Sequence, residues 1–268
     1  METEKTKMHF TDPYLINPTN PITVNLIGAG GTGSKVLTAL MEMNHSLTVL
    51  GHAGLSVRLW DDDIVTSANL GRQRFAPCET GLHKSVALIN RANRFMGTDW
   101  KAETVKFEKD PLGRFPKNMQ AVIYISCVDS VRSRFEIAHV LNLQSNRRHH
   151  RDAPKYWMDF GNSQYTGQVV LSTVGEIPQP KSEKFETVAQ LPFVTEEFGE
   201  LLRQSEAVDD TPSCSLAEAL EKQDLFINSA LAQMGCSLLW NLFRQGMTEN
   251  RGFFLSLKNF HTQPLKAG

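Results

Sequence analysis

No stretch of the sequence is apolar over the roughly 18 residues that a membrane-spanning helix needs. The opening residues, METEKTKMHFTDPYLINP, also lack the apolar core of a signal peptide or a membrane anchor. The formal net charge is only -1, so no broad electrostatic surface for nucleic acid or an anionic membrane is expected. We therefore expect a cytoplasmic protein that binds neither nucleic acid nor a membrane.

Cysteine is scarce, and the four cysteines lie far apart, at Cys78, Cys127, Cys214 and Cys236. Because no C-x-x-C pair occurs, the usual signature of a cysteine-rich structural zinc site is missing, and no structural zinc is expected. In a cytoplasmic protein these thiols are expected to be reduced and mostly buried, with room for one reactive thiol among them.

Short apolar runs alternate with helical patterns along most of the chain. The runs predict strands at residues 22–27, 55–60, 104–107, 121–128, 156–160, 168–174 and 253–257, the last of them closing an edge of the sheet. Helices are predicted at residues 34–43, 82–95, 131–143 and 225–243. This alternation is typical of an α/β fold with a mainly parallel central sheet.

The 268 residues are expected to form a single domain, 1–268, with three parts. A nucleotide-binding core occupies residues 22–174. Residues 175–212 hold prolines and polar residues around the apolar island LPFVTEEFGELL, which predicts a long excursion with a short helix. Residues 213–268 form a C-terminal part with a helix and an edge strand.

A glycine-rich loop, GAGGTG, follows the strand predicted at residues 22–27 and precedes a predicted helix. Its glycines are Gly28, Gly30, Gly31 and Gly33. Glycines allow a tight turn and let backbone N–H groups approach a phosphate, while the start of the helix favours negative charge. The loop therefore predicts nucleotide binding, with a purely structural turn as the alternative.

Asp61 stands at the end of the second predicted strand. A dinucleotide-binding fold has an acidic residue there for the ribose hydroxyls, about 20 residues past the glycine loop. The spacing is longer in this chain, and the insertion NHSLTVLGHAG explains the excess. By these features alone, a protein that binds ATP and one that binds NAD look alike.

Asn69, Arg72 and Gln73 have the i, i+3 and i+4 spacing that places side chains on one face of a helical turn. Lys84 follows on the next helix. Facing a glycine loop, these four side chains could together bind a triphosphate, the arginine through its planar fork and the lysine as a point charge. The alternative is a solvated helix face.

The same residues resemble the signature of the ThiF/MoeB/E1 superfamily, whose members activate the C-terminus of ubiquitin-like or sulfur-carrier proteins. The matching pattern is Asp61-x-Asp63-x-Val65-x-x-x-Asn69-Leu70-x-Arg72-Gln73, followed by Gly81-x-x-Lys84 and Ser126-Cys127-Val128-Asp129-Ser130. The resemblance weakens through the excursion and resumes near Cys214. Within the superfamily, the chain most resembles the ThiF-type component of the bacterial PRTRC gene system.

The resemblance implies a Rossmann-like adenylation fold with a mainly parallel central sheet, antiparallel C-terminal strands and a long crossover loop. It implies ATP and Mg²⁺ as cofactors. The implied nucleotide-binding residues are Gly28, Gly30, Gly31, Gly33, Asp61, Asp63, Asn69, Arg72, Gln73 and Lys84. Asp61 would take the ribose hydroxyls, and Asp129 would hold Mg²⁺, which prefers carboxylate and phosphate oxygens. A helix N-cap is the alternative role of Asp129.

The implied reaction is attack of a carrier protein's C-terminal carboxylate on the α-phosphorus of ATP, which gives an acyl-adenylate and pyrophosphate. An ionised carboxylate needs no general base, so Arg72, Lys84 and Asp129 would act by positioning and charge stabilisation. Thr211-Pro212-Ser213-Cys214-Ser215-Leu216 is similar to the segment that carries the nucleophile of thioester-forming E1 enzymes. Cys214 is thus the candidate for a second step, with an unreactive loop cysteine as the alternative, and the resemblance also implies a homodimer.

One departure from the superfamily concerns the ATP γ-phosphate, to which many members supply an arginine from near the N-terminus of the partner subunit. In this chain no arginine precedes Arg58, and only Lys5, Lys7 and His9 are basic before the glycine loop. A nucleotide-binding scaffold without catalysis is therefore one alternative. An NAD(P)-dependent oxidoreductase is the other, although it does not explain why Arg72, Lys84 and the amide side chains occur together.

Overall fold

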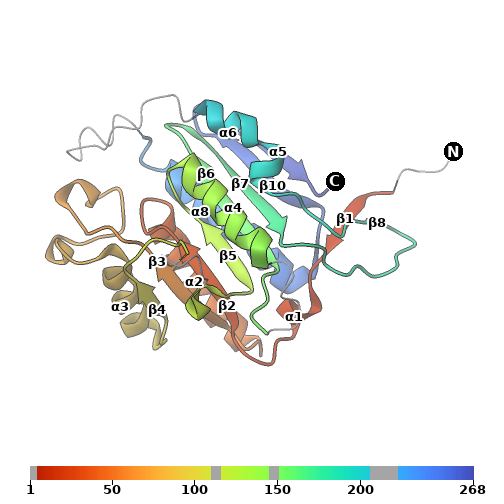
Figure 1. Cartoon of the computed structure of the whole chain (residues 1–268), viewed down its shortest axis with the longest axis horizontal. Coiled ribbons are helices and arrows are strands. Elements are labelled where there is room, and N and C mark those ends of the chain that lie inside the picture. Colours follow the sequence, from red (N-terminus) through yellow and green to blue (C-terminus); the bar gives the residue numbers. More distant parts are fainter. Residues whose placement is uncertain (1–4, 110–115, 145–150, 206–222) are drawn as a thin grey trace.

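The structure is a computed structural model and describes residues 5–109, 116–144, 151–205 and 223–268 (Figure 1). The strands are β1 (Lys7–Phe10), β2 (Ile22–Ile27), β3 (Leu55–Trp60), β4 (Lys101–Glu103), β5 (Ile123–Ser126), β6 (Tyr156–Asn162), β7 (Thr166–Thr173), β8 (Glu186–Thr187), β9 (Met247–Thr248), β10 (Asn250–Ser256) and β11 (His261–Lys266). The α-helices are α1 (Pro13–Ile16), α2 (Gly33–Val49), α3 (Lys84–Met96), α4 (Val131–Gln144), α5 (Val194–Glu197), α6 (Gly199–Ser205) and α8 (Ile227–Gln245). Short 3-10 turns lie at Ser67–Asn69, Pro77–Glu79 and Lys117–Met119.

The main sheet of the described residues has the strand order β11-β10-β7-β6-β5-β2-β3-β4. The pairs from β4 through β3, β2 and β5 to β6 are all parallel. The pairs β6–β7, β7–β10 and β10–β11 are antiparallel. The prediction of an α/β fold with a mainly parallel centre and antiparallel C-terminal strands is thus confirmed.

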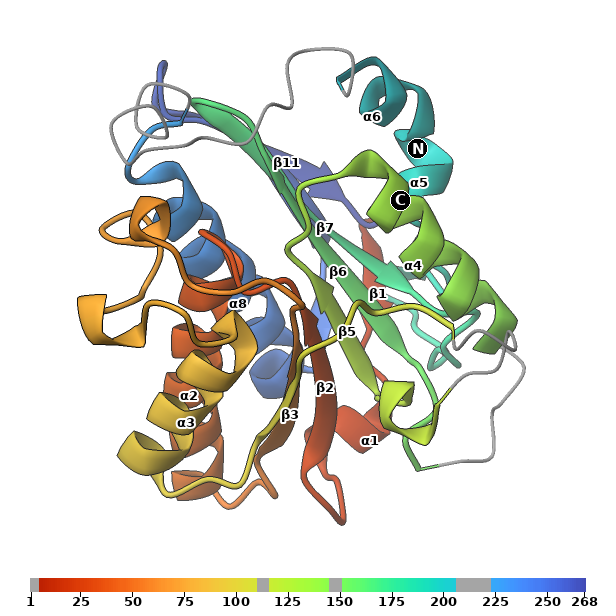
Figure 2. The same ribbon diagram turned by 60° about the vertical axis from the view of Figure 1, so that its left-hand side comes forward.

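Helices cover both faces of this sheet, with α2, α3 and α8 on one face and α4, α5 and α6 on the other (Figure 2). Successive strand residues point to opposite faces. On β5, Ile123 and Ile125 therefore pack in the core under α2 and α8, while Tyr124 packs in the core under α4. The central strands are apolar on both faces because each face is buried, as parallel sheets require.

The loops that follow β2, β3 and β5 all leave the same edge of the sheet, because these strands are parallel neighbours. The glycine loop follows Ile27, Asp61 follows Trp60, and the segment Cys127–Asp129 follows Ser126. Ligands of open α/β sheets bind beyond the carboxyl ends of the strands. The fold therefore gathers the polar residues of three separate sequence segments at one place.

A second, small sheet in the order β8-β1-β9 was not predicted from the sequence. Its strands are two to four residues long, and β1 pairs in parallel with β8 and antiparallel with β9. Strands this short carry too few residues for an alternating pattern to be recognised. The described part of the predicted excursion at residues 175–212 contains β8, α5 and α6.

The strand predicted at residues 104–107 is wrong. The strand at this place, β4, lies just upstream at Lys101–Glu103 and pairs with Arg58–Trp60 of β3. Phe107 lies in a loop, and its ring is buried in the core, where it packs edge-on against Trp60 with centroids 5.2 Å apart. Its apolar side chain, which favoured a strand in the sequence, is therefore explained by this core packing.

The expectation that the last strand closes an edge is also wrong. The strand β10 lies between β7 and β11, and β11 is the edge strand. β11 is largely exposed and contains Pro264, so its sequence has neither an apolar run nor a clear alternation.

The NHSLTVLGHAG insertion also has a structural explanation, since it extends α2 to Val49. No helix in the described residues is long and apolar enough to cross a membrane.

Candidate nucleotide-binding site

A cavity of about 460 Å³ opens at the carboxyl ends of β2, β3, β5 and β6. Nine of the residues predicted for the site line it: Gly28, Gly30, Gly31, Asp61, Asp63, Arg72, Gln73, Lys84 and Asp129. Gly33 and Asn69 do not line it, and Cys214 lies outside the described residues. The structure thus brings together residues that are up to about a hundred positions apart in the sequence.

The glycine loop is shaped by close backbone contacts. Gly28 has a φ of +96°, and a Cβ there would lie 2.7 Å from the carbonyl oxygen of Cys127. A Cβ at Gly33 would lie 1.9 Å from the carbonyl oxygen of Gly28. By contrast, a Cβ at Gly30 would meet no atom within 4 Å. Gly28 and Gly33 are therefore required by the fold, whereas the backbone at Gly30 is open toward the cavity.

Asp61, which follows β3, holds the glycine loop in place through a hydrogen bond to its carboxylate. Its carboxylate accepts hydrogen bonds from the backbone N–H groups of Ala29, at 2.6 Å, and Asp63, at 3.0 Å. Burial raises the pKa of Asp61, an effect opposed by the Ala29 hydrogen bond and by the charge of Lys84. A carboxylate has about four lone-pair positions, so Asp61 retains acceptor capacity for the hydroxyls of a ribose.

Lys84 is held at the cavity by an ion pair. Its Nζ donates to Oδ2 of Asp63 at 2.7 Å. The lysine side chain is 9% exposed, whereas that of Asp63 is 66% exposed. The methylene chain of Lys84 is therefore buried while its ammonium group lies at the cavity, and the carboxylate of Asp63 lies on the solvent side.

Arg72 and Gln73 present polar atoms that lack partners among the described residues. Nη1 of Arg72 donates to Oε1 of Gln223 at 3.0 Å, but its Nε is buried without a hydrogen bond. Oε1 of Gln73 is buried and unpaired as well. Burial lowers the pKa of Arg72. An unpaired buried polar group is costly, and a polar ligand in the cavity is one source of the partners that these atoms lack among the described residues.

Asn69 has a different role from its neighbours in the motif. Its side-chain Oδ1 accepts hydrogen bonds from the backbone N–H and the hydroxyl of Thr66, at 2.8 and 3.1 Å. Its carbonyl oxygen accepts from the backbone N–H of Gln73 at 3.0 Å. The spacing of Asn69, Arg72 and Gln73 thus reflects a single turn after a 3-10 helix, in which Asn69 holds the turn that presents the other two.

Asp129 is exposed and lines the cavity at the start of α4. The first turn of this helix is capped by Ser130, whose hydroxyl accepts the N–H of Ser133 at 3.1 Å. The cap therefore does not use the carboxylate of Asp129. No group of three or more His, Cys, Asp or Glu in the described residues could hold a metal by itself. A single carboxylate suits Mg²⁺, which proteins commonly bind through one or two carboxylates together with substrate phosphates.

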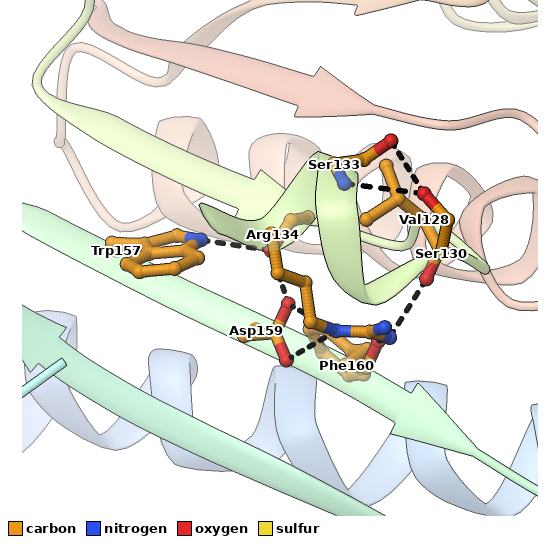
Figure 3. Close-up of polar contacts among 8 residues, drawn as sticks. Val128, Ser130, Ser133, Arg134, Trp157, Asp159 and Phe160 are labelled. Carbon is orange, nitrogen blue, oxygen red and sulfur yellow. Dashed lines mark hydrogen bonds and ion pairs between the residues drawn. The ribbon is translucent and has the colours of Figure 1, made fainter. Parts of the chain in front are cut away.

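A buried ion pair under the Asp129 loop escaped the sequence analysis (Figure 3). Nε of Arg134 on α4 donates to both carboxylate oxygens of Asp159 on β6, at 3.1 and 3.2 Å. Nη2 of Arg134 donates to the carbonyl oxygens of Val128, at 2.7 Å, and Phe160, at 3.1 Å. Because Val128 immediately precedes Asp129, this arginine anchors the loop that carries the carboxylate.

A second network joins the glycine loop to the N-terminal end of α8 and was also missed. Oδ1 of Asn228 accepts hydrogen bonds from the hydroxyl of Thr32, at 2.7 Å, and from Nδ2 of Asn162, at 3.0 Å. Nδ2 of Asn228 donates to Oε1 of Gln223, the residue that also pairs with Arg72. Asn162, Gln223 and Asn228 come from outside the recognised motifs, so only their meeting in space with Thr32 and Arg72 reveals them.

Cys127 lines the cavity, yet its environment disfavours a nucleophilic role. Burial, and next the charge of Asp159, raise the pKa of the Cys127 thiol well above its usual value. The thiolate is the reactive form of cysteine, so this thiol is held in its unreactive form at neutral pH.

The β-strand order, the flanking helices and the glycine-loop cavity define an α/β protein of the Rossmann-like type. The chain matches the model of the ThiF family over residues 19–267 and belongs to this family. A comparison with curated proteins found no match.

Solved structures with the same fold include PaaA, which has a TM-score of 0.57, is 14% identical and covers 92% of this chain and 64% of its own. MccB of E. coli has a TM-score of 0.58, is 14% identical and covers 95% of this chain and 63% of its own. MccB structures with ATP, and with AMPCPP and MccA, match with TM-scores of 0.55 and 0.57. The chain thus spans less than two thirds of the length of these proteins. At 14% identity these matches show that the chain shares the fold of PaaA and MccB.

Proposed function

We propose that the protein adenylates the C-terminal carboxylate of a small ubiquitin-like or sulfur-carrier protein, using ATP and Mg²⁺. The observation that carries the proposal is the convergence of Arg72, Lys84 and Asp129 on the glycine-loop cavity. A di- or triphosphate would supply acceptors for the Arg72 guanidinium and for the Lys84 ammonium. The similarity in fold to MccB, crystallised with ATP and with AMPCPP and MccA, supports a site for a nucleotide and a partner together.

In the proposed reaction, a carboxylate oxygen of the carrier attacks the α-phosphorus of ATP, the bond to the bridging oxygen breaks, and pyrophosphate leaves. The carboxylate is ionised at neutral pH and therefore needs no general base. Arg72 and Lys84 bind phosphate oxygens and stabilise the charge that develops on them, while Asp61 orients the ribose. Asp129 and the phosphates would hold Mg²⁺, which neutralises phosphate charge when bound.

A homodimer is part of the proposal, as the resemblance implies, and the cations of the N-terminal segment are remote from the cavity of their own chain. The strand β1 pairs with β9, which follows the C-terminal end of α8, whereas the glycine loop contacts Asn228 at the other end of that helix. With 19 residues, α8 separates the two sites by about 28 Å. His9 is in addition fully buried between Val188 and Tyr156, and burial lowers its pKa. Lys5 and Lys7 therefore lie far from the cavity of their own chain, and in the proposed homodimer they are the candidates to reach the partner's site.

Two finer assignments rest on the resemblance in sequence alone. The first is a second step in which the thiol of Cys214 attacks the acyl-adenylate, forming a thioester and releasing AMP; Cys214→Ser should then still adenylate but form no conjugate that thiols cleave. The second is membership of the bacterial PRTRC gene system. The alternative of a nucleotide-binding scaffold without catalysis follows from the missing N-terminal arginine, and it predicts ATP binding without any turnover.

The test is ATP–pyrophosphate exchange with candidate ubiquitin-like and sulfur-carrier proteins, each supplied with a free and with an amidated C-terminus. The proposal predicts exchange with one free-carboxylate carrier and none with its amidated form, since an amide cannot form the acyl-adenylate. Two protein variants are compared: Asp129→Ala removes a carboxylate that lines the cavity, and Asp99→Ala removes one that is exposed next to β4. Only Asp129→Ala should lower the exchange. Exchange that persists with the amidated carrier, or in Asp129→Ala, would contradict the proposed chemistry.

A further inference from the structure

Lys35 lies in the first turn of α2, directly after the glycine loop, and is only 8% exposed. Its Nζ donates to the carbonyl oxygen of Gly31 at 3.2 Å and to the carbonyl oxygen of Arg72 at 2.8 Å. These two hydrogen bonds join the loop that would face the phosphates to the segment that presents the Arg72 guanidinium. Neighbouring Ser34 strengthens this connection, since its hydroxyl donates to Gly31 and accepts the backbone N–H of Arg74.

The charge around Lys35 is not balanced within the described residues. Both of its hydrogen-bond partners are neutral carbonyl groups, and no described carboxylate forms an ion pair with it. The charged groups that act on it are Arg74 and Arg72, which are also cations. Burial, then Arg74 and Arg72, lower the pKa of Lys35 to about 8. A buried cation beside two arginines favours the binding of an anion that carries more than one charge.

We propose that Lys35 is a positioning residue of a polyphosphate site: it fixes the glycine loop against the Arg72 segment, and binding of a nucleoside di- or triphosphate is coupled to proton uptake at Lys35. This inference rests on the proposed function, because it requires that the cavity binds ATP. It goes further by distinguishing a nucleotide with several phosphates from one with a single phosphate. Lys35 does not line the cavity, so it acts through the carbonyl groups that it holds and through its charge.

The direction of the proton linkage follows from the charges. A phosphate anion near Lys35 stabilises the ammonium form and raises the pKa of Lys35 in the complex. Because the pKa of Lys35 in the free protein lies at about 8, part of the molecules lack this proton near pH 8, and binding should take up a fraction of a proton. Well below pH 8 Lys35 is already protonated in the free protein, and the uptake should vanish. AMP, with one phosphate, should give a smaller uptake than ATP.

The experiment is calorimetric titration of the full chain with ATP–Mg²⁺ and with AMP, near pH 8 and near pH 6.5, each in two buffers of different ionisation enthalpy. The variants are Lys35→Arg, which keeps a permanent charge, Lys35→Met, which removes it, and Lys101→Met, a control at an exposed lysine. Thermal unfolding of each variant checks that it is folded. We expect wild type and Lys101→Met to take up protons near pH 8 only, and Lys35→Arg to bind ATP without uptake. Lys35→Met should bind ATP about tenfold or more weakly, because it removes the two charge-assisted hydrogen bonds that join the glycine loop to the Arg72 segment.

The outcomes separate this inference from the function on which it rests. If wild type binds no ATP, the proposed function fails. If wild type binds ATP without proton uptake, or if Lys35→Arg retains the uptake, Lys35 is not the group that titrates and the inference is overturned. Should Lys35→Met fail to fold, the comparison between wild type and Lys35→Arg still decides the result.

Discussion

Arg134 and Asp159 form an ion pair in which both side chains are at most 5% exposed. The same guanidinium donates a hydrogen bond to the carbonyl oxygen of Val128, the residue that precedes Asp129 in the sequence. Asp159 also accepts a hydrogen bond from the hydroxyl of Ser126 at 2.6 Å. The pair thus connects α4, β5 and β6 at the point where the cavity begins. Its role in the site is to fix the loop that carries the exposed carboxylate.

Arg134→Met should lower the free energy of unfolding by about 3–5 kcal/mol, because it leaves the Asp159 carboxylate buried without its partner. The double variant Arg134→Met/Asp159→Asn should be less destabilised than Arg134→Met alone, since neither charge then remains buried. Urea denaturation of the wild type and the two variants measures the difference. A double variant at least as unstable as Arg134→Met would show that uncompensated charge is not the cause of the loss.

Lys84→Met should weaken the binding of ATP–Mg²⁺ by about tenfold to a hundredfold, the equivalent of one charge-assisted hydrogen bond to a phosphate. Isothermal titration gives the dissociation constants, and Lys101→Met serves as the control because Lys101 is an exposed lysine paired with exposed Asp99. Equal affinities of wild type and Lys84→Met would remove Lys84 from the phosphate site.

Two substitutions in the glycine loop should separate folding from binding. Gly33→Ala places a Cβ 1.9 Å from the Gly28 carbonyl oxygen and should destabilise the protein by about 1–3 kcal/mol through overpacking. Gly30→Ala meets no protein atom within 4 Å and should change the stability by less than about 0.5 kcal/mol. If phosphates approach the loop at Gly30, the same variant binds ATP more weakly. Thermal unfolding and ATP titration of both variants check this contrast, and a stable Gly33→Ala would contradict the account of the loop.

Alkylation should modify the described cysteines in the order of their exposure and thiolate content. Cys78 is exposed, whereas burial raises the pKa of Cys127 well above its usual value and that of Cys236 to about 12. Because each raised pKa keeps the thiol protonated, Cys127 and Cys236 should stay unmodified near pH 8 while Cys78 reacts. Mass spectrometry after timed treatment with iodoacetamide measures the rates. Modification of Cys127 as fast as that of Cys78 would show that its thiol is accessible and ionised.

The sequence predicted the central strands and the loop residues because both depend on local patterns. The apolar runs at residues 22–27 and 55–60 match β2 and β3 in full, and parallel pairing then places Gly28 and Asp61 at one edge of the sheet. The roles of individual residues within the motif were less predictable. Asn69 holds a turn through Thr66, a contact that motif spacing does not reveal.

Contacts between distant segments could not be predicted from one sequence. Asn228 reaches Thr32 across 196 positions, and Arg134 reaches Asp159 across 25. Neither pair has a local pattern, since each partner has ordinary neighbours in the chain. The edge strand β11 was not predicted for a local reason: it is exposed, and its sequence therefore lacks the apolar alternation by which strands are recognised.

The central claim is that the cavity binds ATP with a metal held at Asp129, and the most direct test is a titration that requires no partner protein. Purified protein would be titrated with ATP plus Mg²⁺ and with NAD⁺, beside the variant Asp129→Ala. The account predicts saturable binding of ATP that weakens in the variant, with the difference lost when Mg²⁺ is removed by a chelator. Binding of NAD⁺ together with indifference to ATP would contradict it, and the aspartates after β3 would then belong to a dinucleotide site.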